Sequence, residues 1–427
     1  MKQKTIEKNI EDKKIAKDEI EQAEVKETQI AEEEKIEEKE EEIKQKVEQK
    51  SVNNSKEKND NIEEIQPKKK MPVWKKILIS ILTLGIIGIS TLLILFYGPI
   101  PTFRDWWITT AMTTMSHKYL AEWFFDEETI NEVLAKNTIE ETDDTTDTSL
   151  IVITPPEEEE EIVVEIEYEN EYEKQLLAKN LEKEEYNIYA EGEEYRIIKI
   201  EGNGYSGYLA AIYDPSKVKV ATSKYIGRNG QYLVDMSKDN NATIAINGGG
   251  FLDENGRGDG STPLGIVMSE GKLVANNGNT VGGGLVGFDK DNKLVIGKMS
   301  AQKAQEIGIR DAVTFAPFLI VNGEPAVIRG NGGWGTAPRT AIGQRQDGIV
   351  LFLVLDGRRL TMPGASIKDL IEIMQNYGAY NAANLDGGTS SAMTYNHELV
   401  NDPVDASGNH RTRHIATSFI FTNEEEN

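Results

Sequence analysis

The stretch SIKDLIEIMQNYGAYNAANLDGGTSSAM, residues 366–393, decides the fold. Ser366 can cap a helix, an aspartate three residues later can complete a capping box, and apolar residues recur at helical spacing up to residue 377. Gly378 ends this predicted helix, and an apolar strand over 382–385 follows it. The strand runs directly into Asp386 and two glycines. This order predicts an α/β arrangement that delivers a carboxylate to the end of a strand.

Short apolar runs cut by glycine surround this stretch from about residue 195 onward, which is typical of strands. Asn322-Gly323, between two such runs, is a strong hairpin signal. The roughly 230 residues of this part are enough to bury a substantial core. We therefore predict one strand-rich, mixed α/β domain over 195–427. Its predicted strands are 195–200, 208–213, 217–222, 243–246, 265–268, 284–288, 294–296, 317–321, 326–329, 340–343, 349–355 and 418–421, with a second hairpin turn at 289–292 and further helices at 231–238 and 301–307.

A long apolar segment precedes this domain. Ile77 to Tyr97 carries no charge over 21 residues, which at 1.5 Å per residue is long enough to cross a hydrocarbon core of about 30 Å. The segment is internal and longer than the apolar region of a signal peptide, so we expect a retained transmembrane helix in contact with membrane lipid. Lysines gather before it (Lys68, Lys69, Lys70, Lys75, Lys76), and only Arg104 and Lys118 follow within about 20 residues. The bias predicts a single-pass protein in the cell membrane, with a cytoplasmic N-terminus and an extracytoplasmic C-terminal domain.

The rest of the chain is divided by composition. Residues 1–66 form a Glu/Lys-rich tract whose apolar residues are mostly five apart, a spacing that spirals around a helix, so we predict a disordered cytoplasmic tract and no coiled coil. Residues 98–137 contain clustered tryptophan and phenylalanine and predict membrane-proximal helices lying on the outer leaflet. Residues 138–194 are rich in Thr, Asp and Glu and predict an extended acidic spacer.

Composition excludes several classes of function. The net charge is −25, and no basic stretch follows the apolar segment, which argues against a nucleic-acid partner. The chain has no cysteine, which excludes a disulfide framework, a thiol nucleophile, Cys-ligated zinc and iron–sulfur clusters. The absence of cysteine is compatible with an exported bacterial protein. The sequence does not indicate an oligomeric state.

Two glycine-rich motifs resemble ligand loops. Residues 202–207 match G-x-G-x-x-G, but a strand follows them where a dinucleotide site needs a helix, so we interpret them as a β-turn. The loop from Asp253 to Asp259 resembles the start of a calcium loop but lacks the acidic residue at its twelfth position. A divalent cation could bind there, and we favour a plain polar loop. We assign no metal and no cofactor.

Four segments place a polar residue beside glycine at the end of a predicted strand. They are 246–251 with Asn247, 337–343 with Arg339 and Thr340, 355–358 with Asp356 and Arg358, and 384–393 with Asp386. Asn and Asp before Gly are ordinary turn formers, and for one segment that reading suffices. Because all four occur in one domain, two with a carboxylate and two with an arginine, we favour a site at convergent strand ends.

This ordered set, with the helix before its last member, resembles the phosphodiester glycosidase family from about residue 202 to 422. The resemblance implies a mixed α/β fold and a hydrolase that cleaves a sugar-1-phosphodiester into free sugar and a phosphomonoester. The cysteines and downstream modules of the vertebrate member are missing here, and the layout is closer to bacterial members associated with exopolysaccharide. The positions that match the family's motifs are Asn247, Arg339, Thr340, Asp356, Asp386, Gly387, Gly388, Thr389, Ser390 and Arg413.

The chemistry of such a reaction suggests roles for these residues. Breaking a glycosidic bond normally uses two carboxylates, and a phosphate-ester leaving group needs its charge neutralised more than it needs a strong acid. We hypothesise that Asp386 is nearest the anomeric carbon, with Asp356 as its partner, although the two roles could be exchanged. Arg339 would clamp the phosphate with both arms of its guanidinium.

Further groups would line the substrate. Arg358 and Arg413 are second choices for the phosphate. The Gly387-Gly388 backbone and the hydroxyls of Thr389, Ser390 and Ser391 could donate to substrate oxygens. Trp334 has equal chances of stacking on a sugar face and of simply packing.

We therefore predict a membrane-anchored, extracytoplasmic glycosidase that acts on a phosphate-containing wall or capsule glycan. Two alternatives stay open: a non-catalytic polysaccharide-binding or exopolysaccharide-assembly protein, and a phosphodiesterase that cleaves P–O instead of C–O. The enzymatic reading requires that Asp356, Asp386 and Arg339 meet at one hollow in the folded chain.

Overall fold

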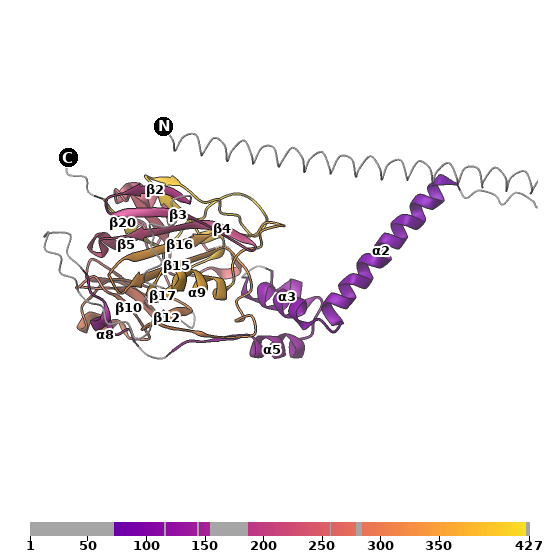
Figure 1. Cartoon of the computed structure of the whole chain (residues 1–427), viewed down its shortest axis with the longest axis horizontal. Helices are drawn as coiled ribbons and strands as arrows, with labels where there is room; N and C mark the ends of the chain where they lie inside the picture. The colour runs from indigo at the N-terminus through magenta and orange to yellow at the C-terminus, as the bar shows by residue number, and fades with distance from the viewer. Residues whose placement is uncertain are drawn as a thin grey trace, which may run out of the picture. The chain divides into compact units, whose positions relative to one another are not determined.

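A computed structural model of the chain describes residues 72–114, 117–142, 145–153, 187–256, 258–278 and 284–423 (Figure 1). The tract 1–66 lies outside the described residues, as does 154–186 of the predicted spacer. The chain divides into two compact units, Met1–Ile86 and Ile87–Asn427. The second unit contains every strand among the described residues.

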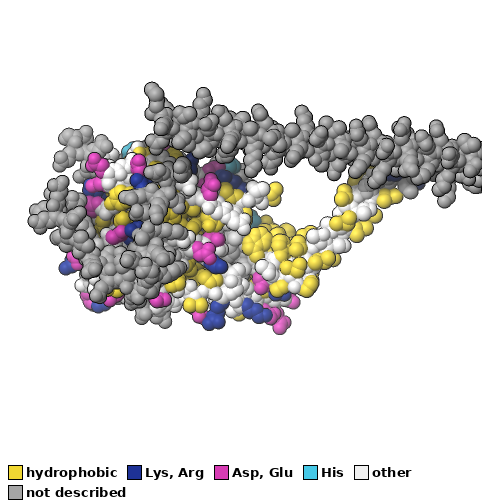
Figure 2. All heavy atoms as spheres, viewed as in Figure 1, with side chains coloured by type: hydrophobic (Ala, Val, Ile, Leu, Met, Phe, Trp, Pro, Cys, Tyr) yellow, Lys and Arg dark blue, Asp and Glu magenta, His cyan; other side chains and the backbone are white. Residues whose placement is uncertain are grey.

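Helix α2 (Val73–Tyr97) coincides with the predicted membrane segment and is the one helix of the described part that is long and apolar enough to cross a membrane. Its side chains form a largely hydrophobic surface in Figure 2, and only Phe96 among them is buried. Thr83 and Thr91 donate their hydroxyls to the carbonyls four residues earlier, each at 2.8 Å. These bonds satisfy the two threonine hydroxyls within the helix itself.

Three helices follow within the segment predicted to be helical: α3 (Pro101–Thr113), α4 (Tyr119–Glu122) and α5 (Glu127–Lys136). They pack around Phe96. Helix α3 also contacts the loop 331–336: the Trp106 indole donates to the Thr336 hydroxyl at 3.0 Å, and Asn331 donates to the Thr109 hydroxyl at 2.9 Å. Trp106 therefore contacts protein, whereas Trp123 is 73% exposed.

The centre of the domain is an eight-stranded sheet in the order β13-β12-β17-β15-β16-β4-β3-β2, and every strand pair of the described part is antiparallel. Two five-stranded sheets, β10-β9-β11-β7-β8 and β19-β18-β6-β20-β5, and a small β1-β14 pair complete the strands of this part. The central sheet consists of β2 (Ile188–Gly192), β3 (Tyr195–Gly202), β4 (Tyr205–Ile212), β12 (Phe318–Val321), β13 (Glu324–Pro325), β15 (Arg339–Arg345), β16 (Val350–Leu355) and β17 (Ala379–Leu385). The other strands are β1 (Thr138–Glu140), β5 (Val218–Thr222), β6 (Ile244–Asn247), β7 (Gly265–Ser269), β8 (Lys272–Asn277), β9 (Gly284–Asp289), β10 (Leu294–Gly297), β11 (Ile309–Phe315), β14 (Val327–Arg329), β18 (Met393–Tyr395), β19 (Glu398–Leu399) and β20 (Thr417–Phe421).

The central sheet is buried on both faces. Along β16, Phe352 and Val354 join the core shared with the two five-stranded sheets, and Leu351 and Leu353 join the core under helix α9 (Ile367–Asn376). Figure 1 shows α9 beside β15 and β17. Helices α7 (Leu233–Asp239) and α8 (Ala301–Glu306) cover the five-stranded sheets. The uninterrupted apolar sequence of β16 follows from this burial, since neither of its faces meets water.

The main sequence predictions of the fold are confirmed. The domain is a strand-rich, mixed α/β fold, α9 begins with the predicted capping box at Ser366, and Asn322-Gly323 joins β12 to β13. Residues 202–207 turn between β3 and β4, with Gly204 at φ 91°.

The structure differs from the predicted domain boundaries at both ends of the segment 138–194. Strand β1 pairs with β14, and β2 is the edge strand of the central sheet beside β3. These ends carry Ile139, Ile188 and Ala190, whose burial against the domain outweighs the acidic composition around them. Strands β8 and β11 were not predicted, because charged or polar residues interrupt their apolar pattern.

Candidate active site

The candidate site lies at the edge of the central sheet where β16 and β17 end and β15 begins between them. Arg339 pairs with Leu355, and Thr340 pairs with Leu385. This register places Arg339, Asp356 and Asp386 at one edge of the central sheet. Among the described residues, no hydrogen bond or ion pair joins any two of these three side chains, so each has to be considered by its own contacts.

Strand β6 of a second sheet supports Asp386 from behind. The Asn247 amide donates to the Asp386 carbonyl at 2.5 Å, and the Asp386 N–H donates to the Gly248 carbonyl at 3.1 Å. The Thr340 hydroxyl and the Ala392 N–H donate to the Asn247 side-chain oxygen at 2.7 and 3.1 Å. Asn247 and Thr340 are fully buried. The structure therefore places both residues behind the site, where they hold the backbone that carries Asp386.

The Asp386 carboxylate is enclosed by charged neighbours. Burial raises its pKa to about 6, and nearby Asp253 adds to the rise, although Ser390, Arg413 and the Gly387 backbone lower it. A carboxylate with a pKa this far above its usual value is typical of a functional site.

Asp253 and Arg413 form a two-pronged ion pair beside Asp386. Arg413 donates to the two Asp253 oxygens at 2.6 and 2.9 Å and to the Gly258 carbonyl at 2.8 Å. Burial alone would raise the pKa of Asp253, but the Arg413 and Gly258 hydrogen bonds outweigh it and leave the pKa below its usual value. Asp253 is the acidic neighbour of Asp386 that sequence reasoning missed. From the sequence, a divalent cation was considered for the loop that carries Asp253. Within the described part, the positively charged group that binds Asp253 is the Arg413 guanidinium.

Arg358 is the second guanidinium near Asp386. It has a backbone φ of 60° and donates to the Thr389 hydroxyl at 2.7 Å and to the Val404 carbonyl at 3.3 Å. Gly388 has a positive φ, and a Cβ on it would lie 2.7 Å from the Arg358 guanidinium, so a larger residue there would strain the backbone and displace this guanidinium. Burial lowers the pKa of Arg358, and Asp386 is one of the acidic groups that oppose this. Arg358 and Arg413 thus both interact electrostatically with Asp386.

Arg339 is placed differently from its predicted role as a phosphate clamp. Its guanidinium donates to three backbone carbonyls, of Ala365 at 3.2 Å, Trp334 at 2.7 Å and Gly335 at 3.0 Å. It also lies 5.8 Å from the centre of the Trp334 ring, which packs on the core under α9. Burial lowers the pKa of Arg339 to about 10. These contacts make Arg339 a support for the loop 334–335.

We expect Arg339→Ala to destabilise the protein. The carbonyls of Ala365, Trp334 and Gly335 would each lose the guanidinium as a donor, which at about 1 kcal/mol per hydrogen bond lowers the free energy of unfolding by about 3 kcal/mol. Urea denaturation of the wild type and the variant measures this loss. Arg329→Ala is the control, because Arg329 is exposed and bonds Glu140 at the surface. An Arg339→Ala variant that unfolded at the same urea concentration as the wild type, and lost only its activity, would instead support the phosphate clamp predicted from sequence.

Asp356 also has partners other than Asp386. Its two oxygens accept hydrogen bonds from the Asn401 amide at 2.8 Å and from the Asp402 N–H at 3.0 Å. Burial raises its pKa, while these two hydrogen bonds lower it. Asp356 therefore connects the end of β16 to the segment 401–402.

The hydroxyl groups that follow Asp386 differ in their hydrogen bonding. Thr389 is bonded to Arg358, the Ser390 hydroxyl lies by the Asp386 carboxylate and lowers its pKa, and the buried Ser391 hydroxyl has no hydrogen-bond partner within the described part of the chain. Gly388, at φ 65°, begins the short 3₁₀ turn that presents them. Buried polar atoms without partners are rare in proteins, and at a site they are available to a ligand. The same described residues contain no group of three or more His, Asp or Glu side chains placed to hold a metal ion.

Comparison with known proteins confirms the resemblance found in the sequence. Residues 240–422 match the model of the phosphodiester glycosidase family. The chain is 26% identical over 234 residues to the mouse N-acetylglucosamine-1-phosphodiester alpha-N-acetylglucosaminidase, covering 48% of this chain and 43% of that protein. It is 29% identical over 203 residues to an uncharacterized SPbeta prophage-derived protein of Bacillus subtilis, YomE, covering 45% of this chain and 30% of that protein. The chain thus spans less than half the length of these relatives, and the matches support a hydrolase.

Solved structures show similar chains. The catalytic domain of the zebrafish N-acetylglucosamine-1-phosphodiester alpha-N-acetylglucosaminidase, auto-inhibited by its pro-peptide, aligns with a TM-score of 0.46 and 23% identity over 54% of this chain and 83% of that one. A putative exported protein from Burkholderia pseudomallei aligns with a TM-score of 0.40 and 18% identity over 51% of this chain and 74% of that one.

Proposed function

We propose that the domain hydrolyses a sugar-1-phosphodiester at its C–O bond, releasing free sugar and a phosphomonoester. The observation that carries this proposal is the pairing of Asp386, whose pKa is raised to about 6, with the two nearby guanidiniums of Arg358 and Arg413. Such a site offers a carboxylate to an electron-poor carbon and positive charge to an anionic leaving group. The family match over 240–422 supports the same reaction class.

The leaving group explains why this site needs cations. A phosphomonoester is a weak base, so its departure requires charge stabilisation more than a proton. Arg358 is suited to this role, because its other contacts within the described part are with neutral oxygens of Thr389 and Val404. Arg413 forms an ion pair with Asp253 and would contribute its positive charge to the site while it stays paired. The Ser390 and Ser391 hydroxyls would donate to oxygens of the sugar or phosphate.

Asp386 acts on the anomeric carbon, either directly or through a water molecule, and Asp253 is the second carboxylate of the site. This changes the pairing expected from sequence, in which Asp356 accompanied Asp386. Asp253 lies near Asp386 and keeps its negative charge through Arg413, whereas both oxygens of Asp356 are engaged by the segment 401–402.

The proposed role of Asp386 has a pH signature. An attacking or proton-accepting carboxylate must be ionised, and the pKa of Asp386 is raised to about 6. We therefore expect kcat/KM to rise from about pH 5 to about pH 7 and to level off above it. Initial rates on a phosphodiester that stays ionised over this range give the profile. A rate that fell above pH 6 instead would make Asp386 a proton donor.

Hydrolysis in ¹⁸O-labelled water tests the bond that is cleaved. The substrate is a methyl phosphodiester of N-acetylglucosamine 1-phosphate, the group named in the mouse relative. Label in the released sugar means C–O cleavage and supports the proposal, whereas label in the phosphate means P–O cleavage and overturns it. A protein that bound glycan without releasing either product would be an assembly or binding protein.

The natural substrate and the membrane location are further parts of the proposal. Helix α2 would anchor the chain with its N-terminus in the cytoplasm, as the five lysines before the apolar segment indicate. The domain would then act outside a bacterial cell on a phosphate-containing wall or capsule glycan. Protease added to intact cells tests this topology. We expect the domain to be digested and an epitope placed before residue 66 to be protected.

A further inference from the structure

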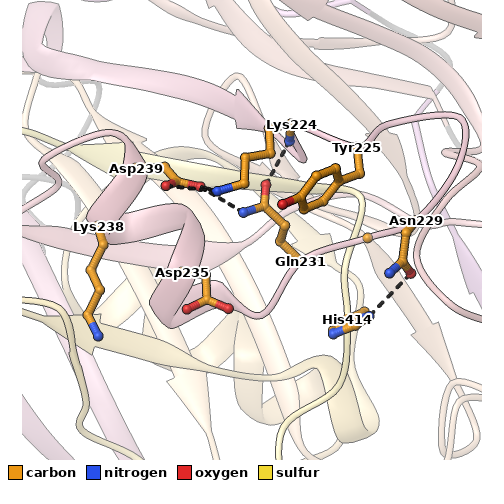
Figure 3. A pocket seen from close by; sticks show the side chains of 9 residues that line it. Lys224, Tyr225, Asn229, Gln231, Asp235, Lys238, Asp239 and His414 are labelled. Carbon is orange, nitrogen blue, oxygen red and sulfur yellow. Dashed lines mark hydrogen bonds and ion pairs between the residues drawn. The ribbon is translucent and has the colours of Figure 1, made fainter.

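A pocket lies between the loop after β5, helix α7 and His414, the residue that follows Arg413 of the candidate site (Figure 3). Its volume is about 230 Å³, and it is lined by residues 224, 225 and 229–231, by three residues of α7 and by His414. This is below the roughly 300 to 1,000 Å³ of pockets for drug-sized ligands, so the pocket has room for one small ring and not for a larger ligand. None of its lining side chains belongs to the candidate active site.

The pocket shares a wall with the active site. In the loop that begins at Asp253, the Asp253 carboxylate and the Gly258 carbonyl accept hydrogen bonds from the Arg413 guanidinium. At the other end of this loop the Asp259 carbonyl accepts the Gly230 N–H at 2.8 Å. A Cβ on Gly260 would come within 2.9 Å of the His414 backbone, so the loop lies directly against residues 413–415. A ligand that extends from Arg413 toward His414 therefore reaches the pocket.

The charges that line the pocket cancel. Lys224 forms an ion pair with Asp239 at 2.9 Å, and Asp235 and Lys238 supply one further charge of each sign. The Gln231 amide donates to Asp239 at 2.7 Å and its oxygen accepts the Lys224 N–H at 2.7 Å. The lining thus presents both donors and acceptors with no excess charge. A neutral, hydroxyl-rich ligand fits this lining better than an anion or a cation does.

An aromatic ring forms one side of the pocket. Tyr225 is 51% exposed, and the Lys224 ammonium lies 5.4 Å from the centre of its ring. Opposite, the His414 ring packs edge-on against Tyr232, with centroids 4.3 Å apart, and its Nδ1 lies 3.3 Å from the Asn229 side-chain oxygen. Figure 3 shows Tyr225 and His414 both facing the pocket. An exposed ring with polar groups around it suits the flat apolar face of a sugar.

We propose that this pocket is a subsite for a neutral sugar ring of the glycan chain that carries the phosphodiester. The inference rests on the proposed function, because it extends the same substrate beyond the bond that is cleaved. A chain with several sugars would occupy both places, and a minimal phosphodiester would occupy only the active site.

Two substrates test the subsite with the full-length chain in detergent: the methyl phosphodiester of N-acetylglucosamine 1-phosphate, and the phosphodiester in which an N-acetylglucosamine trisaccharide replaces the methyl group. We expect Tyr225→Ala to raise KM for the longer substrate about tenfold, which is within the energy of one aromatic contact. Its kcat and its KM for the methyl ester should stay at the wild-type values. Tyr189→Ala is the control, because Tyr189 is 42% exposed on β2 and does not line the pocket.

An equal change for both substrates, or no change for either, overturns the subsite. A binding measurement separates this failure from failure of the proposed function. Should the wild type hydrolyse neither ester, calorimetric titration with the free trisaccharide decides alone. Binding that is present in the wild type and lost in Tyr225→Ala supports the subsite, and absence of binding in the wild type overturns it.

Discussion

An Asp386→Asn variant is expected to lose hydrolysis of the sugar-1-phosphodiester, with kcat lower by about 10³-fold or more. Asparagine has nearly the same shape but cannot carry the charge that attacks carbon or accepts a proton. Its stability should be preserved or improved at pH 8. The folded-state pKa of Asp386, about 6, lies above the ordinary value of 3.8, so the ionised carboxylate disfavours the folded state as pH rises through this range.

Kinetics and urea unfolding on the same preparation test this expectation. Asp356→Asn is the matched control, since it makes the same change at the other carboxylate that the sequence predicted for the site. There the new amide would point a donor at the Asn401 amide or the Asp402 N–H, so we expect a loss of about 1 to 3 kcal/mol in stability with activity retained within tenfold. Equal loss of activity in both variants would instead support the pair of Asp386 and Asp356 that was predicted from sequence.

Arg413→Ala is expected to have the second largest effect, a fall of about 10² to 10³-fold in kcat/KM. The change removes positive charge from the site and leaves Asp253 without its ion-pair partner. It also removes a group that lowers the pKa of Asp386. The inflection of the pH–rate profile should therefore move to higher pH, a result that loss of structure alone would not produce.

Rates measured across pH for Arg413→Ala and Arg413→Lys provide the test. Lysine keeps the charge but has no planar fork for the two Asp253 oxygens, so we expect an intermediate rate and a smaller movement of the inflection. An Arg413→Ala variant with wild-type rates and an unmoved inflection would remove Arg413 from the mechanism and leave Arg358 as the cation of the site.

The local sequence was sufficient for the elements that depend on nearest neighbours. The capping box of α9, the Asn322-Gly323 hairpin and the 202–207 turn all formed as predicted. Each is specified by a few adjacent residues whose backbone preferences act over one turn. The apolar run at 349–355 likewise predicted a strand, and the structure shows that this strand, β16, is buried on both faces.

Residue types at strand ends predicted where a site would form but not what each side chain does there. Arg339 and Asp356 stand at the expected edge, yet backbone carbonyls of residues 334, 335 and 365 engage Arg339, and the Asn401 side-chain amide and the Asp402 N–H engage Asp356. Asp253 was considered only as part of a cation loop. Its partner lies 160 positions away, and nothing in either local sequence specifies that pair.

The sequence by itself determined the strand-rich α/β class, the apolar helix before the domain and the four glycine-flanked segments at the ends of predicted strands. Tertiary structure alone decided which carboxylate accompanies Asp386, which arginines remain near it and that a neutral pocket adjoins them. The physical reason is the distance along the chain over which each effect acts. Backbone preference and apolar periodicity act within a few residues, whereas burial, ion pairing and the pKa of a carboxylate depend on groups that only the folded chain brings together.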